Sequence, residues 1–428
     1  MTSDTANTTL LQAQEAYVWI WLPKATQPVV AGRLAKQADG RWTFNYGQSY
    51  LARPHAISIY SPELPLTAGA IPLMNHLQIP SCIRDAAPDA WGRRVIINRL
   101  MSQNDLGVNS DDIEHNELLF CLGSGSDRIG ALDFQASPNQ YVPRLSQVST
   151  LEELMQSAER VEQGVPLSPA LDAALQHGTS IGGARPKALI DDGTKKYIAK
   201  FSSTQDVTNV VKAEFIAMRL AKIAGLTVAE VQLTHAMGKD VLLIERFDRS
   251  HDKSGWQRHA MVSALTMLQL SEMEARYASY EDLATLIRQR FDAPKLQLEE
   301  LFKRLVFNIL CGNTDDHARN HAAFWDGKHL KLTPAYDICP QPRTGGEATQ
   351  AMLIKDQQRF SQLKLCMAFA PACMLSKAQA NQIIQHQLNV IRTHWQSTCH
   401  AAGLSEIDRT TLWGRQFLNP YALQGWLE

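Results

Sequence analysis

Residues 312–337 constrain the fold of this chain more than any other stretch. An apolar pattern at helical spacing predicts a core helix over 296–311, and Gly312 ends it. The loop that follows reads Asn-Thr-Asp-Asp-His-Ala-Arg-Asn over 313–320. A hairpin pattern comes next, and Asp337 follows it. A helix, a loop with Asp and then Asn, a hairpin and a second Asp form the order of groups found in phosphoryl-transfer enzymes.

Phosphoryl transfer needs these residue types for definite reasons. A carboxylate must accept or orient the proton of the attacking hydroxyl. An Asn oxygen and a second carboxylate suit Mg²⁺, a hard cation that prefers oxygen ligands. Asp315, Asn320 and Asp337 meet this requirement in order and spacing.

The same interpretation requires a β-rich region upstream, with a Lys on a strand and a Glu on the next helix. Lys200 lies in a strand predicted over 195–201, and Glu214 lies in an amphipathic helix predicted over 209–224. Before the strand, residues 180–187 read Ser-Ile-Gly-Gly-Ala-Arg-Pro-Lys. The two glycines permit close approach of the backbone to a phosphate, and two cations accompany them.

Together these motifs resemble the HipA-type serine/threonine kinases, the toxins of bacterial HipBA toxin–antitoxin systems. The resemblance covers most of the chain and is more distant over residues 1–110. Six ordered motifs carry it: SIGGARPK (180–187), YIAKF (197–201), AEFIAMRLAKIAGL (213–226), LIERFDR (243–249), NTDDHARN (313–320) and LTPAYDI (332–338).

The resemblance implies a role for each matching position, with ATP and Mg²⁺ as cofactors. Asp315 corresponds to the catalytic Asp, and Asn320 and Asp337 correspond to the Mg²⁺ ligands. Lys200 is expected to contact the ATP phosphates. The remaining nucleotide-binding positions are a hinge facing adenine (Glu245, Arg246, Phe247) and a loop covering ATP (Ser180, Ile181, Gly182, Gly183, Ala184, Arg185, Lys187).

Three further positions carry expectations of their own. Ser180 matches the family's autophosphorylation site, where a phosphate would add about −1.5 to −2 charges beside ATP. Arg185 stands where some members carry Gln, so it adds a cation near the phosphates or pairs with phosphorylated Ser180. His317 is a further catalytic candidate that could neutralise transferred charge, whereas the sequence gives no role for Asp316.

The charge balance limits the partners of the chain. A formal net charge of −1 does not fit a strongly basic nucleic-acid-binding chain, and no helix-turn-helix pattern is evident. The resemblance implies a separate HipB-like helix-turn-helix antitoxin, with operator DNA contacted indirectly through it. Among the family's protein substrates are aminoacyl-tRNA synthetases, which implies translation arrest.

Three functions therefore stay open at this point. The first is a serine/threonine protein kinase toxin that also modifies Ser180. The second is an antitoxin-bound co-repressor with weak or silent kinase activity. The third is a kinase for a small molecule, because kinase folds of that kind share the Asp-x-x-x-x-Asn loop.

The sequence predicts a cytoplasmic chain without membrane spans. Its seven cysteines are odd in number and form no C-x-x-C pair, which disfavours both a disulfide framework and a zinc ribbon. The apolar run over 16–23 is too short to cross a bilayer.

The expected fold is α+β, with a two-lobed protein-kinase-like core and an added N-terminal α+β subdomain. We predict the N-terminal subdomain over 1–110, a small β-rich ATP-binding lobe over 111–255 and a helical catalytic lobe over 256–428. Within the first, residues 16–62 have strand patterns, and residues 84–102 have helical patterns broken near Pro88.

Overall fold

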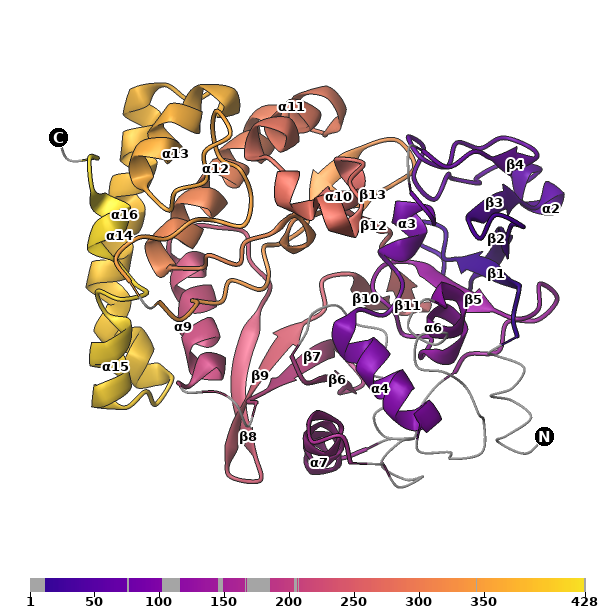
Figure 1. The fold of residues 1–428 in the computed structure, drawn as a ribbon, viewed down its shortest axis with the longest axis horizontal. Helices are drawn as coiled ribbons and strands as arrows, with labels where there is room; N and C mark the ends of the chain where they lie inside the picture. The colour runs from indigo at the N-terminus through magenta and orange to yellow at the C-terminus, as the bar shows by residue number, and fades with distance from the viewer. Residues whose placement is uncertain are drawn as a thin grey trace.

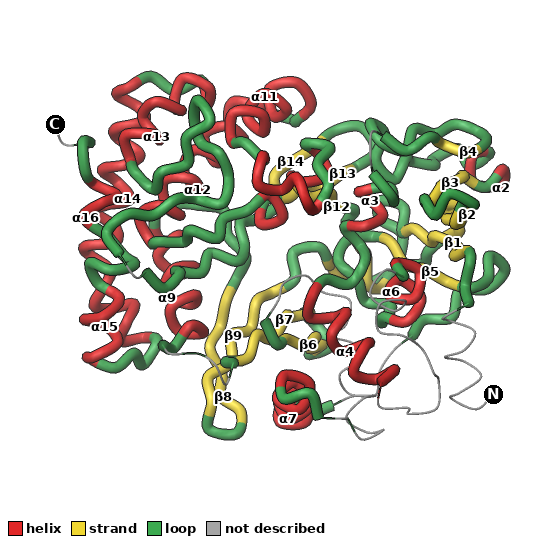
Figure 2. The backbone as a smooth tube through the Cα atoms, viewed as in Figure 1, coloured by secondary structure: helices red, strands yellow, loops and turns green. Residues whose placement is uncertain are grey.

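The structure is a computed structural model. It describes residues 12–74, 77–101, 116–144, 149–165, 167, 185–203, 206, 208–343 and 345–426. Helices fill one side of the molecule, and the N-terminal sheet lies at the opposite side (Figure 1). The remaining strands lie between these two parts (Figure 2).

The N-terminal part is built on a five-stranded antiparallel sheet with the order β4-β3-β2-β1-β5. Its fifth strand pairs with β1, so this unit extends past the predicted boundary at residue 110, which is wrong in that respect. The predicted strand region and the helix break near Pro88 are both present. The elements are β1 (Glu15–Ile20), β2 (Val29–Lys36), β3 (Trp42–Tyr46), α2 (Gln48–Leu51), β4 (Ala70–Ile71), α3 (Ser81–Arg84), α4 (Ala90–Met101), α6 (Glu117–Gly123) and β5 (Leu132–Gln135).

A four-stranded antiparallel sheet with the order β6-β7-β9-β8 forms the second unit. The strand predicted over 195–201 and the helix predicted over 209–224 are confirmed, and Asn209 caps that helix by accepting from the Lys212 backbone N–H. Beyond the helix, Val228 bridges to Ala335 before β8 begins. The elements are α7 (Leu151–Glu162), β6 (Lys187–Asp191), β7 (Lys196–Phe201), α9 (Val210–Ile223), β8 (Val231–Ala236) and β9 (Lys239–Glu245).

The rest of the described chain is mostly helical, as predicted. The β10–β11 hairpin spans the predicted boundary between residues 255 and 256, and a small sheet orders its strands β12-β13-β14. The elements are β10 (Arg249–Asp252), β11 (Gly255–Arg258), β12 (Met261–Ser263), α10 (Ala264–Met267), η2 (Glu272–Tyr277), α11 (Tyr280–Arg290), α12 (Pro294–Cys311), η3 (Ala318–Asn320), β13 (Ala322–Trp325), β14 (Leu330–Leu332), α13 (Leu363–Phe369), η4 (Ala370–Cys373), α14 (Lys377–Ala401), α15 (Glu406–Leu412) and α16 (Pro420–Leu423).

Helix α12 is the central helix of this half. Pro294 stands in its first turn, where a missing N–H costs nothing, and its apolar side chains from Leu298 onward are buried. The helix ends at Gly312, whose φ of +72° is the left-handed conformation that favours glycine. α14 lies against both α9 and α12, so the sheet-bearing unit and the helical half share one core.

All seven cysteines lie in the part of the chain that the structure describes, where they are free and buried. Among the described helices, none combines the length and the apolar composition needed to cross a membrane.

Candidate active site

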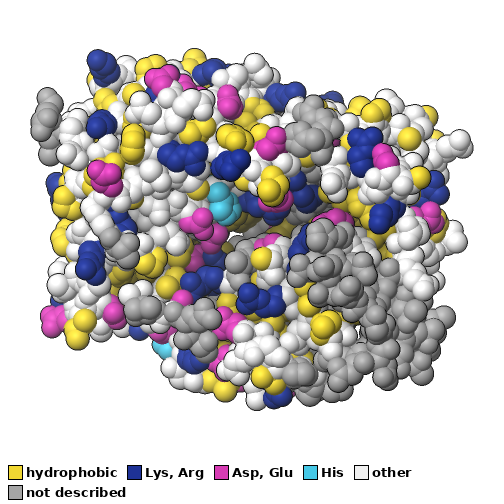
Figure 3. Space-filling view, in the orientation of Figure 1, with side chains coloured by type: hydrophobic (Ala, Val, Ile, Leu, Met, Phe, Trp, Pro, Cys, Tyr) yellow, Lys and Arg dark blue, Asp and Glu magenta, His cyan; other side chains and the backbone are white. Residues whose placement is uncertain are grey.

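The predicted site residues that the structure describes lie where the helical half meets the sheets. Figure 3 shows the surface hollowed between these parts, with acidic, basic and histidine side chains gathered around the hollow. The 313–320 loop enters this region directly from the end of α12. Asp337 reaches it from the segment that follows β14.

Lys200 stands at the centre of the site. Its Nζ donates to Glu214 Oε1 at 2.6 Å and also to the Asp337 carboxylate. Burial raises the pKa of Asp337, but the nearby Lys200 charge outweighs it and lowers that pKa to about 2. The pKa of Lys200 shifts upward, because its two carboxylate partners outweigh the opposing effect of burial. The predicted Lys–Glu pair is therefore formed, and it extends to the candidate metal ligand Asp337.

The segment before Asp337 is tied to both lobes. Ala335 donates its backbone N–H to Thr227 O at 2.8 Å and accepts one from Ala229 at 2.9 Å. Arg304 of α12, which is buried, donates to Thr333 O at 2.6 Å. Asp337 itself has a φ of +59°, a conformation that Asp tolerates better than most residues. These contacts fix the position from which Asp337 extends toward Lys200.

Asp315 and Asn320 lie at the two ends of one short loop. Asn320 Nδ2 donates to Asp315 O at 3.2 Å, which leaves its side-chain oxygen to act as a ligand. The Asp315 side chain is exposed, as a group that meets a substrate must be. Partial burial raises the pKa of its carboxyl, His317 opposes that effect, and Asp337 and Asp316 reinforce it. His317 thus acts electrostatically on Asp315, and it also lowers the pKa of Asp337.

Asp316, whose role the sequence left open, points away from solvent. It lies in a buried set with His321, 2.9 Å from Nε2 to Oδ1, and with the Tyr280 hydroxyl. Burial acts to raise the pKa of Asp316, but its hydrogen bonds and the His321 ring together lower it. Asp316 is therefore an ionised buried carboxylate that cannot reach a substrate.

Lys187 is fully buried on β6 and faces the site from the sheet side. Burial lowers its pKa to about 8, and Asp89 of the N-terminal part acts in the opposite direction. Trp91, at the start of α4, donates its indole N–H to Lys187 O at 3.1 Å. The N-terminal part therefore holds the strand that follows the predicted phosphate loop.

Most of that loop lies outside the described residues. Ser180, Ile181, Gly182, Gly183 and Ala184 lie outside the described residues, so the predictions for them stay predictions. Arg185 is described, and its guanidinium pairs with Asp206. This ion pair gives Arg185 a partner within the chain, an option that the sequence reasoning did not consider.

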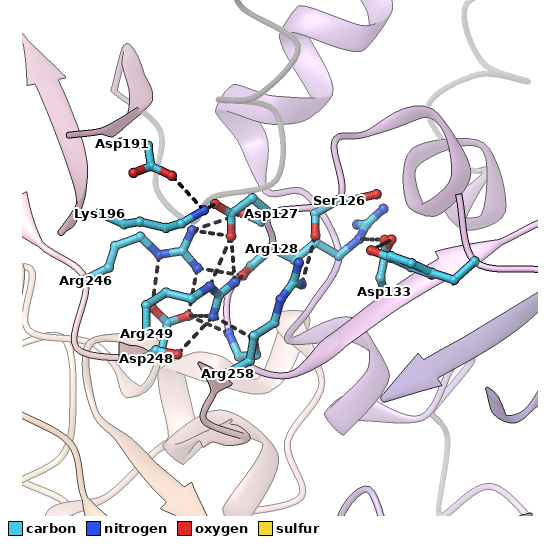
Figure 4. Close-up of polar contacts among 12 residues, drawn as sticks. Ser126, Asp127, Arg128, Asp133, Asp191, Lys196, Arg246, Asp248, Arg249 and Arg258 are labelled. Carbon is cyan, nitrogen blue, oxygen red and sulfur yellow. Dashed lines mark hydrogen bonds and ion pairs between the residues drawn. The ribbon is translucent and has the colours of Figure 1, made fainter. Parts of the chain in front are cut away.

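The predicted hinge residues differ in what they offer a nucleotide. Glu245 pairs with Lys195 at 2.5 Å, and Phe247 packs against Tyr336 with ring centroids 5.6 Å apart. The Arg246 side chain is completely buried and turns toward Asp127 and Asp248 (Figure 4). Only the backbone of Arg246 is therefore left to face a ligand.

We call Asp127, Lys196, Arg246, Asp248 and Arg249 the Asp127 cluster. Asp127 Oδ1 accepts from Arg249 at 2.8 Å and from Arg246 at 3.1 Å, and its Oδ2 accepts from Lys196 at 2.8 Å. Asp248 Oδ2 accepts from the Gly130 backbone N–H at 2.8 Å. The cluster joins the loop before β5 to the chain after β9, a junction that the sequence reasoning missed.

The side chains gathered at the site fit Mg²⁺ and a nucleoside triphosphate. Asp337 and Asn320 offer oxygen ligands, Asp315 adds a carboxylate, and Lys200 and Lys187 provide cations near them. Asn313 Oδ1 and His317 Nδ1 are buried without a hydrogen-bond partner in the described structure, as atoms awaiting a ligand would be. No cluster of three or more His, Cys, Asp or Glu residues suited to a metal ion occurs among the described residues.

Other site residues escaped sequence reasoning for a physical reason. Asn313 donates to Asp337 O at 3.4 Å, and Arg304 holds the segment before Asp337, but an isolated Asn or Arg gives no local signal of such a contact. The spacing of Asp316 and His321 is a weak signal, since it repeats that of Asp315 and Asn320 one residue later.

Comparison with known proteins agrees with this geometry. Residues 179–395 match the HipA-like C-terminal domain family, and residues 22–135 match the HipA N-terminal domain family. The "Serine/threonine-protein kinase toxin HipA" of Shewanella oneidensis is 27% identical over 37% of this chain and 42% of its own length. "Putative kinase Y4mE" of Sinorhizobium fredii is 28% identical over 56% of this chain and 60% of its own length. The matched regions thus span less than two thirds of these relatives.

A solved structure shows the same fold. It is the HipA, HipB and operator DNA complex of the Shewanella oneidensis MR-1 toxin–antitoxin system, matched with a TM-score of 0.61 and 20% identity over 92% of this chain and 97% of that one. The predicted α+β, two-lobed protein-kinase-like fold is confirmed. The chain belongs to the HipA family, with both of the domains that define it.

Proposed function

We propose that this chain is an ATP- and Mg²⁺-dependent serine/threonine protein kinase that acts as the toxin of a toxin–antitoxin pair. The observation that carries the proposal is the meeting of Lys200, Glu214 and Asp337 in one ion-paired set. Lys200 and Glu214 come from a strand and the helix after it, whereas Asp337 comes from a loop 137 residues beyond Lys200. The 313–320 loop supplies the candidate catalytic Asp315 beside them.

In the proposed reaction the chain works by positioning and by electrostatics. When bound, ATP would supply the γ-phosphoryl group, with ADP as the leaving group, and Mg²⁺ would offset part of the negative charge on the phosphates. Asp315 orients the acceptor hydroxyl and accepts its proton, and Asn320 and Asp337 hold the metal. Lys200, kept charged and oriented by Glu214, binds the phosphates. His317 adds positive potential beside Asp315.

Radiolabelled ATP and Mg²⁺ test this proposal on the purified chain, beside Asp315→Asn and Ser180→Ala variants. We expect label on the unaltered chain and none on either variant, which would place autophosphorylation at Ser180. Label on Ser180→Ala but not on Asp315→Asn would keep the kinase and reject that site. Absence of label from every sample, with a whole-cell lysate and small alcohols also offered as acceptors, would contradict the kinase proposal.

The proposed partner is a HipB-like helix-turn-helix antitoxin, with operator DNA contacted through it. The support is the fold shared with the HipA of a HipA, HipB and operator DNA complex. The proposed protein substrate is a translation component such as an aminoacyl-tRNA synthetase. Asp315→Asn separates the kinase from a co-repressor, because it should keep antitoxin binding in a gel-filtration assay and lose phosphorylation.

A further inference from the structure

A buried polar set lies directly behind the 313–320 loop. His321 Nε2 and Asp316 Oδ1 are 2.9 Å apart, the Tyr280 hydroxyl donates to Asp316 Oδ2, and Tyr280 Oη lies 3.2 Å from His321 Nε2. Each of the three residues is at most 2% exposed. None of them can therefore touch a substrate or a nucleotide.

Within this set, Asp316 and His321 have the same sequence spacing as Asp315 and Asn320, the candidate site residues of the loop. Asp316 follows Asp315 in the sequence, and His321 follows Asn320. The loop ends are joined once through Asn320 Nδ2 and Asp315 O, at 3.2 Å, and again through His321 and Asp316. A shift of either buried residue would move the exposed or metal-facing residue next to it.

The set is also anchored outside the loop. Tyr280 begins α11, and its backbone N–H donates to Leu353 O at 2.8 Å. His321 O accepts from the Ala264 N–H at 2.7 Å, at the start of α10. These two backbone hydrogen bonds therefore hold the loop in place relative to α10 and α11, two packed helices of the helical half.

Stability alone is a weak explanation for this arrangement. Burying an ionised carboxylate costs free energy, and apolar side chains of similar volume often serve a core as well or better. What apolar packing does not supply is a directional link between two loop ends that must be held at a fixed separation.

We propose that Asp316, His321 and Tyr280 are positioning residues that fix the separation of Asp315 and Asn320. This inference rests on the proposed kinase function. The set acts on the turnover number, because it aligns the groups that meet the acceptor hydroxyl and the metal. It contributes little to nucleotide affinity, which Lys200 and Lys187 supply from the sheet.

Initial rates of label transfer, measured over ATP and Mg²⁺ series, test the proposal on Asp316→Asn and Tyr280→Phe. We expect Asp316→Asn to lower kcat about 10- to 100-fold, since a displacement of about 1 Å can cost about 100-fold. Tyr280→Phe, which removes one hydroxyl, should lower it less. The KM for ATP should stay within about threefold, and the Mg²⁺ needed for half-maximal rate should rise, because Asn320 moves.

Glu63→Gln is the matched control. Glu63 is 7% exposed and accepts from the backbone N–H groups of Ser81 at 2.5 Å and Cys82 at 2.8 Å, in the N-terminal part. The substitution alters another buried, hydrogen-bonded carboxyl group without touching the 313–320 loop. Its kcat should match that of the unaltered chain.

The outcomes separate this inference from the proposed function. If Asp316→Asn does not fold, Tyr280→Phe decides alone. Folded variants with kcat within twofold of the Glu63→Gln control would overturn the positioning role and leave the kinase proposal standing. A double variant whose loss in kcat equals the product of the two single losses would also overturn it, since residues of one set are not independent. No transfer by the unaltered chain would overturn both proposals.

Discussion

Replacing Lys200 with Met tests how the charges of the candidate site are balanced. Lys200 and Glu214 are 12% and 3% exposed, and their ion pair is 2.6 Å long. In the variant, Glu214 and Asp337 remain close together without the cation that lies between them. Removing one partner of a buried pair costs about 3–5 kcal/mol. Because the Asp337 side chain keeps 36% of its surface exposed and solvent screens it, we expect about 3 kcal/mol of lost stability near neutral pH.

The loss should shrink on acidification. In the unaltered chain the pKa of Asp337 is lowered to about 2, because Lys200 outweighs burial, so Asp337 contributes stability above the unfolded pKa that fades as pH falls toward 2. Burial already raises the pKa of Glu214, and removal of the Lys200 charge, which lowers the pKa of both acids, raises the pKa of Glu214 further and that of Asp337 from its low value. The folded variant then binds protons at a pH where its unfolded chain does not. Its stability therefore approaches that of the unaltered chain as the pH falls from neutral toward the unfolded carboxyl pKa values of about 4.

Urea unfolding of the full chain, followed by tryptophan fluorescence at several pH values, measures this difference. Lys355→Met is the control, because Lys355 also pairs with two acids, Glu281 at 2.7 Å and Asp356 at 2.9 Å, but at the surface. That variant should change little at any pH, as exposed pairs do. Two results would refute the charge balance described above. In the first, Lys200→Met lowers the free energy of unfolding by less than about 1 kcal/mol near neutral pH. In the second, the loss is the same at every pH measured.

Three further substitutions test other parts of the structure. Asp127→Asn weakens the hydrogen bonds that hold Arg246, one of the predicted hinge residues, and should raise the KM for ATP several-fold in the label-transfer assay. An unchanged KM would mean that the Asp127 cluster does not position the predicted hinge. Gly225→Ala should lower the free energy of unfolding by about 1 kcal/mol, because Gly225 has a positive φ but an added Cβ meets no atom within 4 Å. Gly312→Ala should lower it more, because Gly312 also has a positive φ and its Cβ would lie 2.6 Å from Gln416 O. Equal unfolding midpoints would contradict this. Thr150→Ala removes the capping box with Glu153 and should cost about 1 kcal/mol, detectable as faster hydrogen exchange in α7.

Local patterns were enough to predict much of the candidate site. The apolar spacing that ends at Gly312 predicted α12 and the start of the 313–320 loop, and the structure places the helix end there. The strand pattern over 195–201 predicted the strand that carries Lys200, which the structure gives as β7. The amphipathic pattern over 209–224 predicted α9 together with its start after Asn209. In each case the signal and the structure lie within a few residues of one another.

Contacts between distant segments could not be predicted in this way. Lys200 was matched to Glu214, but its bond to Asp337 joins residues that lie in different lobes. Arg246 was predicted only as part of a hinge facing adenine, whereas its side-chain charge is balanced in part by Asp127, which lies in the N-terminal part. A buried charge is stabilised by whatever acid the fold brings to it, and the sequence near an Arg does not reveal that acid.

The Asp127 cluster also bears on whether the two family domains are separable. Residues 179–395 contain Arg246 and Arg249, both buried, but not Asp127, which belongs to the N-terminal match over 22–135. Without residues 22–135 the two guanidinium groups would keep Asp248 but lose Asp127, the other carboxylate that both of them donate to, and Lys187 would lose the Trp91 contact at its backbone. Two buried cations would then share one carboxylate, and a buried charge without its full compensation costs several kcal/mol, a large part of the stability of an average domain. The N-terminal domain is therefore a structural part of the lobe built on the β6-β7-β9-β8 sheet, and a chain reduced to residues 179–395 is not expected to form the candidate site.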